Sequence, residues 1–135
     1  MTASKWSLRG GWLLSGLVTA FMLLDAGMKL VPLDVTVTTT AALGYPPSPA
    51  LIRVLGVLAL GCTALYAYPR TAVLGAVLLT GYMGGAIASH LRLGHPLFSH
   101  ILFGGYLGAL GWGGLYLRDA RLRALLPWSA PATAP

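Results

Sequence analysis

Charged residues are scarce in this chain. Only 9% of its 135 residues are Asp, Glu, Lys or Arg, and glutamate is absent altogether. Soluble globular domains carry roughly 25% charged residues, which keep their surfaces in water. The chain is instead 56% hydrophobic, with a mean hydropathy of +0.75. This composition excludes an ordinary soluble domain and indicates an integral membrane protein.

Cysteine occurs only once. Cys62 is the one thiol, so the chain has no C-x-x-C pair and cannot form an internal disulfide. There is also no phosphate-binding glycine loop, no haem-attachment sequence and no nucleophile–base motif. Any redox chemistry would therefore have to come from a ligand or a partner protein.

Long apolar stretches are abundant, and they set the fold class. A membrane-spanning helix needs roughly 20 consecutive apolar residues. Four stretches qualify, at about 11–31, 50–68, 71–91 and 97–117. They predict an all-α protein, an integral membrane four-helix bundle formed by a single domain over residues 1–135.

The net charge of +6 would suggest nucleic acid in a soluble protein, but here the basic residues flank apolar helices. Cytoplasmic loops of membrane proteins are enriched in Lys and Arg. One set of ends carries Lys5, Arg9, Arg70, Arg118, Arg121 and Arg123, whereas the other carries Lys29, Arg53 and Arg92. The bias predicts cytoplasmic termini and no nucleic-acid partner.

Three segments outside the predicted spans have distinct patterns. The tail "RDARLRALLPW" predicts a short basic amphipathic helix on the inner leaflet, and the final "SAPATAP" predicts disorder. The first external loop, "PLDVTVTTTAALGYPPSP", alternates apolar and polar residues at its start. Its pattern leaves open an extended segment or an irregular cap on the bundle.

Small residues predict how the third and fourth spans pack. Membrane helices associate through small residues that let their backbones approach. Gly81, Gly85 and Ser89 repeat at a spacing of four in the third span, and Gly104 and Gly108 do so in the fourth. We expect a close antiparallel pair with glycine faces in contact.

An acid and a base lie within the first span. Asp25 and Lys29 are four residues apart, so they share a helix face and can pair. A charged residue at such depth costs about 2.5–3.5 kcal/mol and usually faces the bundle interior. The pair is either a structural ion pair or part of a site, and Lys29 could also extend to the outer interface.

All three histidines lie around one turn, "SHLRLGHPLFSH". His90 is about one turn before the end of the third span, and His100 is about one turn into the fourth, so we expect both at similar depth. Arg53 and Arg92 lie at helix ends on the same side. These residues predict one polar layer, although the histidines could simply satisfy each other, Arg92 could extend to the interface, and His95 is expected to be exposed in the loop.

The chemistry of this polar layer suggests a ligand. We take Asp25, His90 and His100 as candidate catalytic residues, and Lys29, Arg53 and Arg92 as candidate ligand-binding residues. The histidine spacing is not a recognised metal-ligand pattern, so no metal site is predicted. The excess of basic groups over one acid favours an anionic or carbonyl-bearing ligand, and a buried carboxylate near imidazoles suits acid–base chemistry.

Four stretches carry a resemblance to a known family: "LLDAGMKL", "LGYP", "YPRTAVLGAVLLTGYMGGAIASHLRLGHPLFSH" and "GALGWGGLYLRDARLRALLP". The chain resembles the DoxX-like family of small bacterial membrane proteins over about residues 16–127. The resemblance implies a four-helix bundle in the bacterial cytoplasmic (inner) membrane. Two departures stand out, because Ala59 occupies a position where relatives often have glutamate, and the Thr-rich first loop differs from the more helical loop expected.

The resemblance also implies a redox role, because some relatives are tied to membrane redox complexes. The first hypothesis is a redox-associated subunit that binds a quinone-like ligand and works with a partner oxidoreductase. The second is a cofactor-free membrane enzyme with Asp25 and a histidine as acid and base. The third is a binding or transport module without chemistry, and four helices could form a transporter only as a homo-oligomer.

Overall fold

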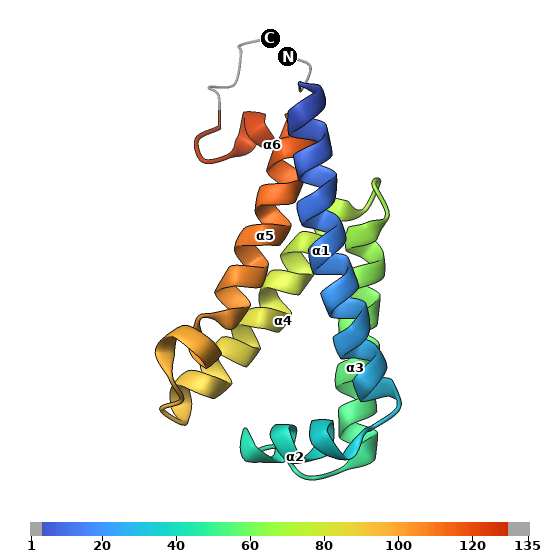
Figure 1. Cartoon of the computed structure of the whole chain (residues 1–135), viewed down its shortest axis with the longest axis vertical. Coiled ribbons are helices and arrows are strands. Elements are labelled where there is room, and N and C mark those ends of the chain that lie inside the picture. The colour runs from blue at the N-terminus through green and yellow to red at the C-terminus, as the bar shows by residue number, and fades with distance from the viewer. Residues whose placement is uncertain (1–3, 130–135) are drawn as a thin grey trace.

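The computed structural model describes residues 4–129 and is all-helical, without strands in that range (Figure 1). Four long helices form the body of the molecule: α1 (Lys5–Leu30), α3 (Pro49–Ala67), α4 (Ala72–Arg92) and α5 (Phe103–Arg118). Three short elements connect or follow them: α2 (Asp34–Ala42), the π-helical turn η1 (Leu97–Ile101) and α6 (Ala120–Leu125). The predicted all-α bundle is confirmed.

The four long helices are tightly packed at one end and diverge at the other. Helix α1 packs against both α3 and α5, and α4 packs against α3 and α5. In Figure 1, α1 and α5 cross near the end where α1 begins, whereas α4 and η1 separate from α1 and α3 at the opposite end. Helix α2 runs across the open end. The fold therefore leaves a cavity where the sequence predicts the polar layer.

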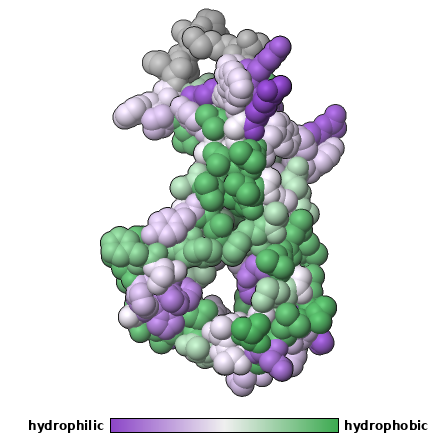
Figure 2. All heavy atoms as spheres, viewed as in Figure 1, coloured by the Kyte–Doolittle hydropathy of each residue, from purple (hydrophilic) through white to green (hydrophobic). Residues whose placement is uncertain are grey.

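The surface of the bundle is suited to lipid. Helices α1, α3 and α4 are long and apolar enough to cross a membrane. The first has 26 residues, or about 39 Å at 1.5 Å per residue. Large hydrophobic side chains such as Leu24, Val57 and Leu74 are exposed along these helices, and hydrophobic residues cover much of the face in Figure 2. Exposed apolar surface on this scale is typical of a protein that sits in a bilayer.

The fourth predicted span, 97–117, is not one continuous helix. It begins as η1, in which the amide of Ile101 donates to the carbonyl of Pro96 at 3.2 Å and that of Leu102 to Leu97 at 2.9 Å. Helix α5 then has 16 residues. The predicted span therefore begins with a wide turn after Pro96, and its regular α-helix is shorter than the apolar stretch.

Residues Asp34–Ala42 of the first loop form α2, so this part of the loop is neither extended nor irregular. Asp34 lies in the first turn, where its negative charge interacts favourably with the helix dipole. Gly44 follows the helix with a φ of +90°, a conformation that glycine adopts readily. Thr36 and Thr40 are each only 6% exposed, so one face of α2 is turned inward. The helix was not predicted because apolar and polar residues alternate at the start of the segment, a pattern that does not indicate a helix.

The predicted glycine contacts between the third and fourth spans are largely absent. A Cβ added to Gly81, Gly85 or Gly108 would meet nothing within 4 Å. Close backbone contacts occur elsewhere, between Gly11 and Gly114 and between Gly75 and α3. One predicted glycine does make the contact, because a Cβ on Gly104 would lie 2.9 Å from Ile87 Cγ1 and 3.3 Å from the carbonyl oxygen of Met83 on α4. Helices α4 and α5 therefore pack together at Gly104, whereas Gly81, Gly85 and Gly108 border open space.

A buried polar cluster holds the tightly packed end together. The hydroxyl of Tyr66, which is 1% exposed, is hydrogen-bonded to Ser15 Oγ at 2.9 Å and donates to the carbonyl of Gly111 at 2.7 Å. Arg118 Nε donates to Ser15 Oγ at 3.1 Å, and its guanidinium stacks on Trp12. These contacts join α1, α3 and α5, so this end is closed.

The predicted C-terminal helix is present as α6, in which Leu122 is buried. Asp119 caps it by accepting from the amide of Arg121 at 2.9 Å. Burial raises the pKa of Asp119, but hydrogen bonds from the side chain and backbone of Arg121 lower it more, so the pKa is below its usual value. The predicted disorder of the last residues concerns 130–135, which lie outside the described residues.

Candidate functional site

A cavity of about 720 Å³ lies where the long helices diverge. Its walls come from α1, α2, α4, η1 and α5, with Leu55 from α3. Figure 2 shows an opening at this end of the molecule, with hydrophilic residues on its borders. The polar lining residues are Asp25, Lys29, Thr36, Thr39, Thr40, Tyr45, Tyr82, His90, His95 and His100. We call this space the outer cavity.

The acid and base on α1 form an ion pair inside the outer cavity. Lys29 Nζ donates to Asp25 Oδ2, in the i,i+4 arrangement that the sequence predicts. The side chain of Lys29 is 15% exposed and that of Asp25 33%. Lys29 Nζ also donates to the hydroxyl of Tyr82 at 3.1 Å and lies 5.6 Å from the ring centroid. The two hydrogen bonds from Lys29, to Asp25 and to Tyr82, therefore join α1 to α4 at the cavity.

The three histidines form a second polar group at the cavity. The ring centroids are 5.0 Å apart for His90 and His95, 5.6 Å for His90 and His100, and 5.5 Å for His95 and His100. Nδ1 of His90 lies 2.8 Å from Nδ1 of His95, so one of the two nitrogens carries the shared proton. Within residues 4–129, no three His, Cys, Asp or Glu side chains are arranged to hold a metal ion.

The two candidate arginines do not line the outer cavity. Arg53 is exposed near the start of α3. Arg92 is also exposed, and its Nη2 donates to the carbonyl of Leu43, just after α2, at 2.8 Å. Nearby, the hydroxyls of Tyr45 and Ser89 are 3.5 Å apart. Arg92 therefore links the α2 segment to α4 and does not line the outer cavity.

Replacing Arg92 by alanine is expected to loosen α2 without unfolding the bundle. The change removes a charge-assisted hydrogen bond to Leu43, of a kind worth about 1.5–3 kcal/mol. Because α2 has few other contacts with α4, the amides of residues 35–45 should exchange with deuterium about ten times faster, whereas those of α3 and α4 stay protected. Hydrogen-exchange mass spectrometry measures both. Arg53→Ala is the matched control, and equal exchange in both variants would contradict this linking role.

Several cavity residues were missed by sequence reasoning. Tyr82 lies eight residues before His90 on α4, so both belong to one broad helix face, and this spacing is a usable signal. Thr39, Thr40 and Tyr45 were missed because α2 was not predicted. His95 was expected to be exposed, but the turn returns it to His90.

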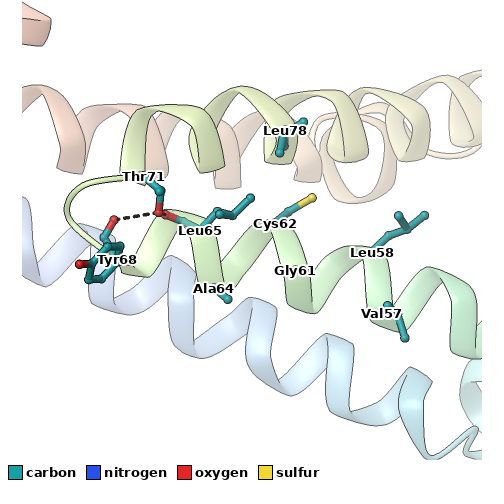
Figure 3. Close-up of a pocket in the computed structure, with 9 residues that line it drawn as sticks. All are labelled: Val57, Leu58, Gly61, Cys62, Ala64, Leu65, Tyr68, Thr71 and Leu78. Atoms are coloured by element: carbon teal, nitrogen blue, oxygen red, sulfur yellow. Dashed lines mark hydrogen bonds between the residues drawn. The ribbon is translucent and has the colours of Figure 1, made fainter.

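A second hollow between α3 and α4 has a different character (Figure 3). It has a volume of about 570 Å³ and is lined almost entirely by apolar groups, with the sulfur of Cys62 toward α4. Thr71 lines this hollow, and its hydroxyl already donates to the carbonyl of Leu65 at 2.7 Å. This surface groove suits a lipid chain and offers little to a polar headgroup.

The fold and the outer cavity define an all-helical membrane protein with a partly polar cavity at one end. Residues 13–114 match the DoxX-like family. Because this match covers well over half of the chain, the chain belongs to the DoxX-like family. No curated protein and no solved structure matches it significantly.

Proposed function

We propose that this protein is a redox-associated membrane subunit that binds a quinone-like or other lipophilic ligand in the outer cavity. The observation that carries the proposal is the combination of apolar walls with polar side chains from several helices in one cavity. Ligand sites are typically cavities of about 300–1,000 Å³ with apolar linings and a few converging polar groups. The outer cavity, at about 720 Å³, fits this description.

The apolar lining supports a lipophilic ligand. Phe21, Met22, Met83 and Leu107 contribute to the walls. The rings of Phe21 and Phe103 are in edge contact, with centroids 5.3 Å apart. A ligand that partitions into the bilayer would reach the cavity sideways from the lipid, through the gap between the diverging helices. A water-soluble substrate would gain less from such walls.

The polar groups support proton exchange with the ligand headgroup. His90 and His100 are the proposed exchanging groups, because an imidazole ring can both donate and accept a proton and both rings line the cavity. Asp25 is held in an ion pair with Lys29, so we assign it a positioning role. Acid–base catalysis by Asp25 itself would first require Lys29 to release the carboxylate.

Electrons would be handled by a partner oxidoreductase, because the described residues offer only the single thiol of Cys62 for redox chemistry. The family supports a bacterial cytoplasmic membrane as the location. The distribution of Lys and Arg supports a multi-pass topology with cytoplasmic termini, which would put the outer cavity on the external side.

Filling the outer cavity tests this function. Gly85 lines the cavity, and a Cβ there would meet nothing within 4 Å, so Gly85→Leu should occupy ligand space without disturbing the fold. We expect mass spectrometry of organic extracts to find a quinone or other lipophile in the gently purified wild-type protein and at least tenfold less in Gly85→Leu.

The neighbouring Gly84 provides a matched control. A Cβ on Gly84 also meets nothing within 4 Å, but this residue does not line the outer cavity. Gly84→Leu should therefore retain the ligand. Extracts that contain only bulk lipid in all three proteins, even after preincubation with a quinone, would refute a ligand site in this cavity.

A further inference from the structure

The Lys and Asp side chains in the outer cavity balance one another in charge. Among the lining residues, Lys29 is the only Lys or Arg and Asp25 the only acid, and they are paired directly. An anionic headgroup would have to compete with Asp25 for Lys29 and would be repelled by the carboxylate. The pair therefore disfavours the anionic ligand that the excess of basic residues in the sequence suggested.

Tyr82 has an available hydrogen-bond donor. Its oxygen accepts from Lys29 Nζ at 3.1 Å, so the proton of the hydroxyl is directed elsewhere. Tyr82 lines the outer cavity and is half-buried. No acceptor within residues 4–129 receives that proton. A hydroxyl that accepts from a cation is polarised and becomes a stronger donor to a further acceptor.

We propose that Tyr82 donates its hydroxyl proton in a hydrogen bond to a neutral carbonyl oxygen of the bound headgroup, and that the Asp25–Lys29 pair excludes anions. This inference rests on the proposed ligand site and specifies the chemical class that the site accepts. Lys29 and Asp25 are positioning residues, because they act through the hydroxyl of Tyr82 and the net charge of the cavity. Neutral quinones and ketones fit, whereas fatty carboxylates do not.

Two probes of similar length separate these classes. The neutral probe is a tritiated benzoquinone with a decyl chain, and the anionic probe is radiolabelled dodecanoate. Binding to the purified full chain is measured by scintillation proximity in detergent at fixed detergent concentration. We expect the wild type to bind the quinone at least tenfold more tightly than dodecanoate.

Two variants test the assigned roles. Tyr82→Phe should weaken quinone binding about tenfold, the effect of one lost hydrogen bond of about 1.4 kcal/mol. Asp25→Asn should leave Lys29 with an unbalanced charge and strengthen dodecanoate binding about tenfold, a gain that a merely destabilised protein would not show. Tyr68→Phe and Asp119→Asn make the same chemical changes away from the outer cavity and should bind like the wild type.

The outcomes separate this inference from the proposed function. Quinone binding that is unchanged in Tyr82→Phe, or a wild type that binds dodecanoate as tightly as the quinone, would overturn the inference and leave the ligand site intact. Binding of neither probe by the wild type would overturn the ligand site itself. If Asp25→Asn does not fold, the two probes on Tyr82→Phe still decide the role of the hydroxyl.

Discussion

Replacing Asp25 by leucine is expected to lower the free energy of unfolding by about 3 kcal/mol. Lys29, only 15% exposed, would lose its ion-pair partner in apolar surroundings. Removing one member of a buried pair typically costs about 3–5 kcal/mol because an uncompensated charge remains. The partial exposure of Asp25, 33%, places our expectation at the lower end. Equilibrium unfolding in mixed detergent micelles measures the change.

The double variant Asp25→Leu/Lys29→Met distinguishes charge from packing. Removing both charges leaves no uncompensated group, so most of the lost stability should return. Arg121→Ala is the control, because it breaks an ion pair in which Arg121 is 85% exposed, and such pairs contribute about 0–1 kcal/mol. A double variant as unstable as Asp25→Leu alone would show that the side-chain shape, and not the charge, is essential.

Replacing Gly75 by alanine is expected to cost about 3 kcal/mol or to prevent folding. A Cβ on Gly75 would overlap the backbone nitrogen and Cα of Tyr66 on α3. Backbone atoms cannot rotate away as a side chain does, so the helices would have to separate. Inserting one methyl group into well-packed contacts costs about 1–3 kcal/mol, and this contact is tighter than most. Movement of Tyr66 would also weaken its bond to Gly111.

Gly81→Ala on the same helix is the matched control. A Cβ there meets nothing within 4 Å, and alanine favours a helix over glycine by about 1 kcal/mol. The control should therefore be as stable as the wild type or more so. Thermal unfolding of both variants, followed by tryptophan fluorescence, provides the comparison. Similar melting temperatures for Gly75→Ala and Gly81→Ala would contradict the close contact of α4 with α3.

Sequence reasoning predicted the positions of three long helices to within a few residues at most boundaries. For α3, the apolar run 50–68 corresponds to Pro49–Ala67, and for α4 the run 71–91 corresponds to Ala72–Arg92. The agreement has a physical cause. A bilayer requires a minimum length of apolar helix, and the turn residues that end each run are local features.

The outer cavity was only partly predictable. Asp25 and Lys29 share a face by helix periodicity, and the histidine turn has to bring His90 and His100 to one end of the bundle. Tyr82 was missed because its role depends on reaching Lys29 on a different helix. Arg53 and Arg92 were included because sequence position indicates depth in the membrane but not which way a side chain points.

The amino-acid sequence alone determines that this chain is a helical membrane protein with its three histidines and the Asp25–Lys29 pair near one end. The tertiary structure decides that α4 and α5 diverge from α1 and α3, and that α2 crosses the gap. It also decides that Gly75, rather than Gly81, meets a neighbouring backbone. Apolar length and helix periodicity are properties of neighbouring residues, whereas a cavity arises from the angles between whole helices. Those angles depend on long-range contacts such as Tyr66 with Gly111.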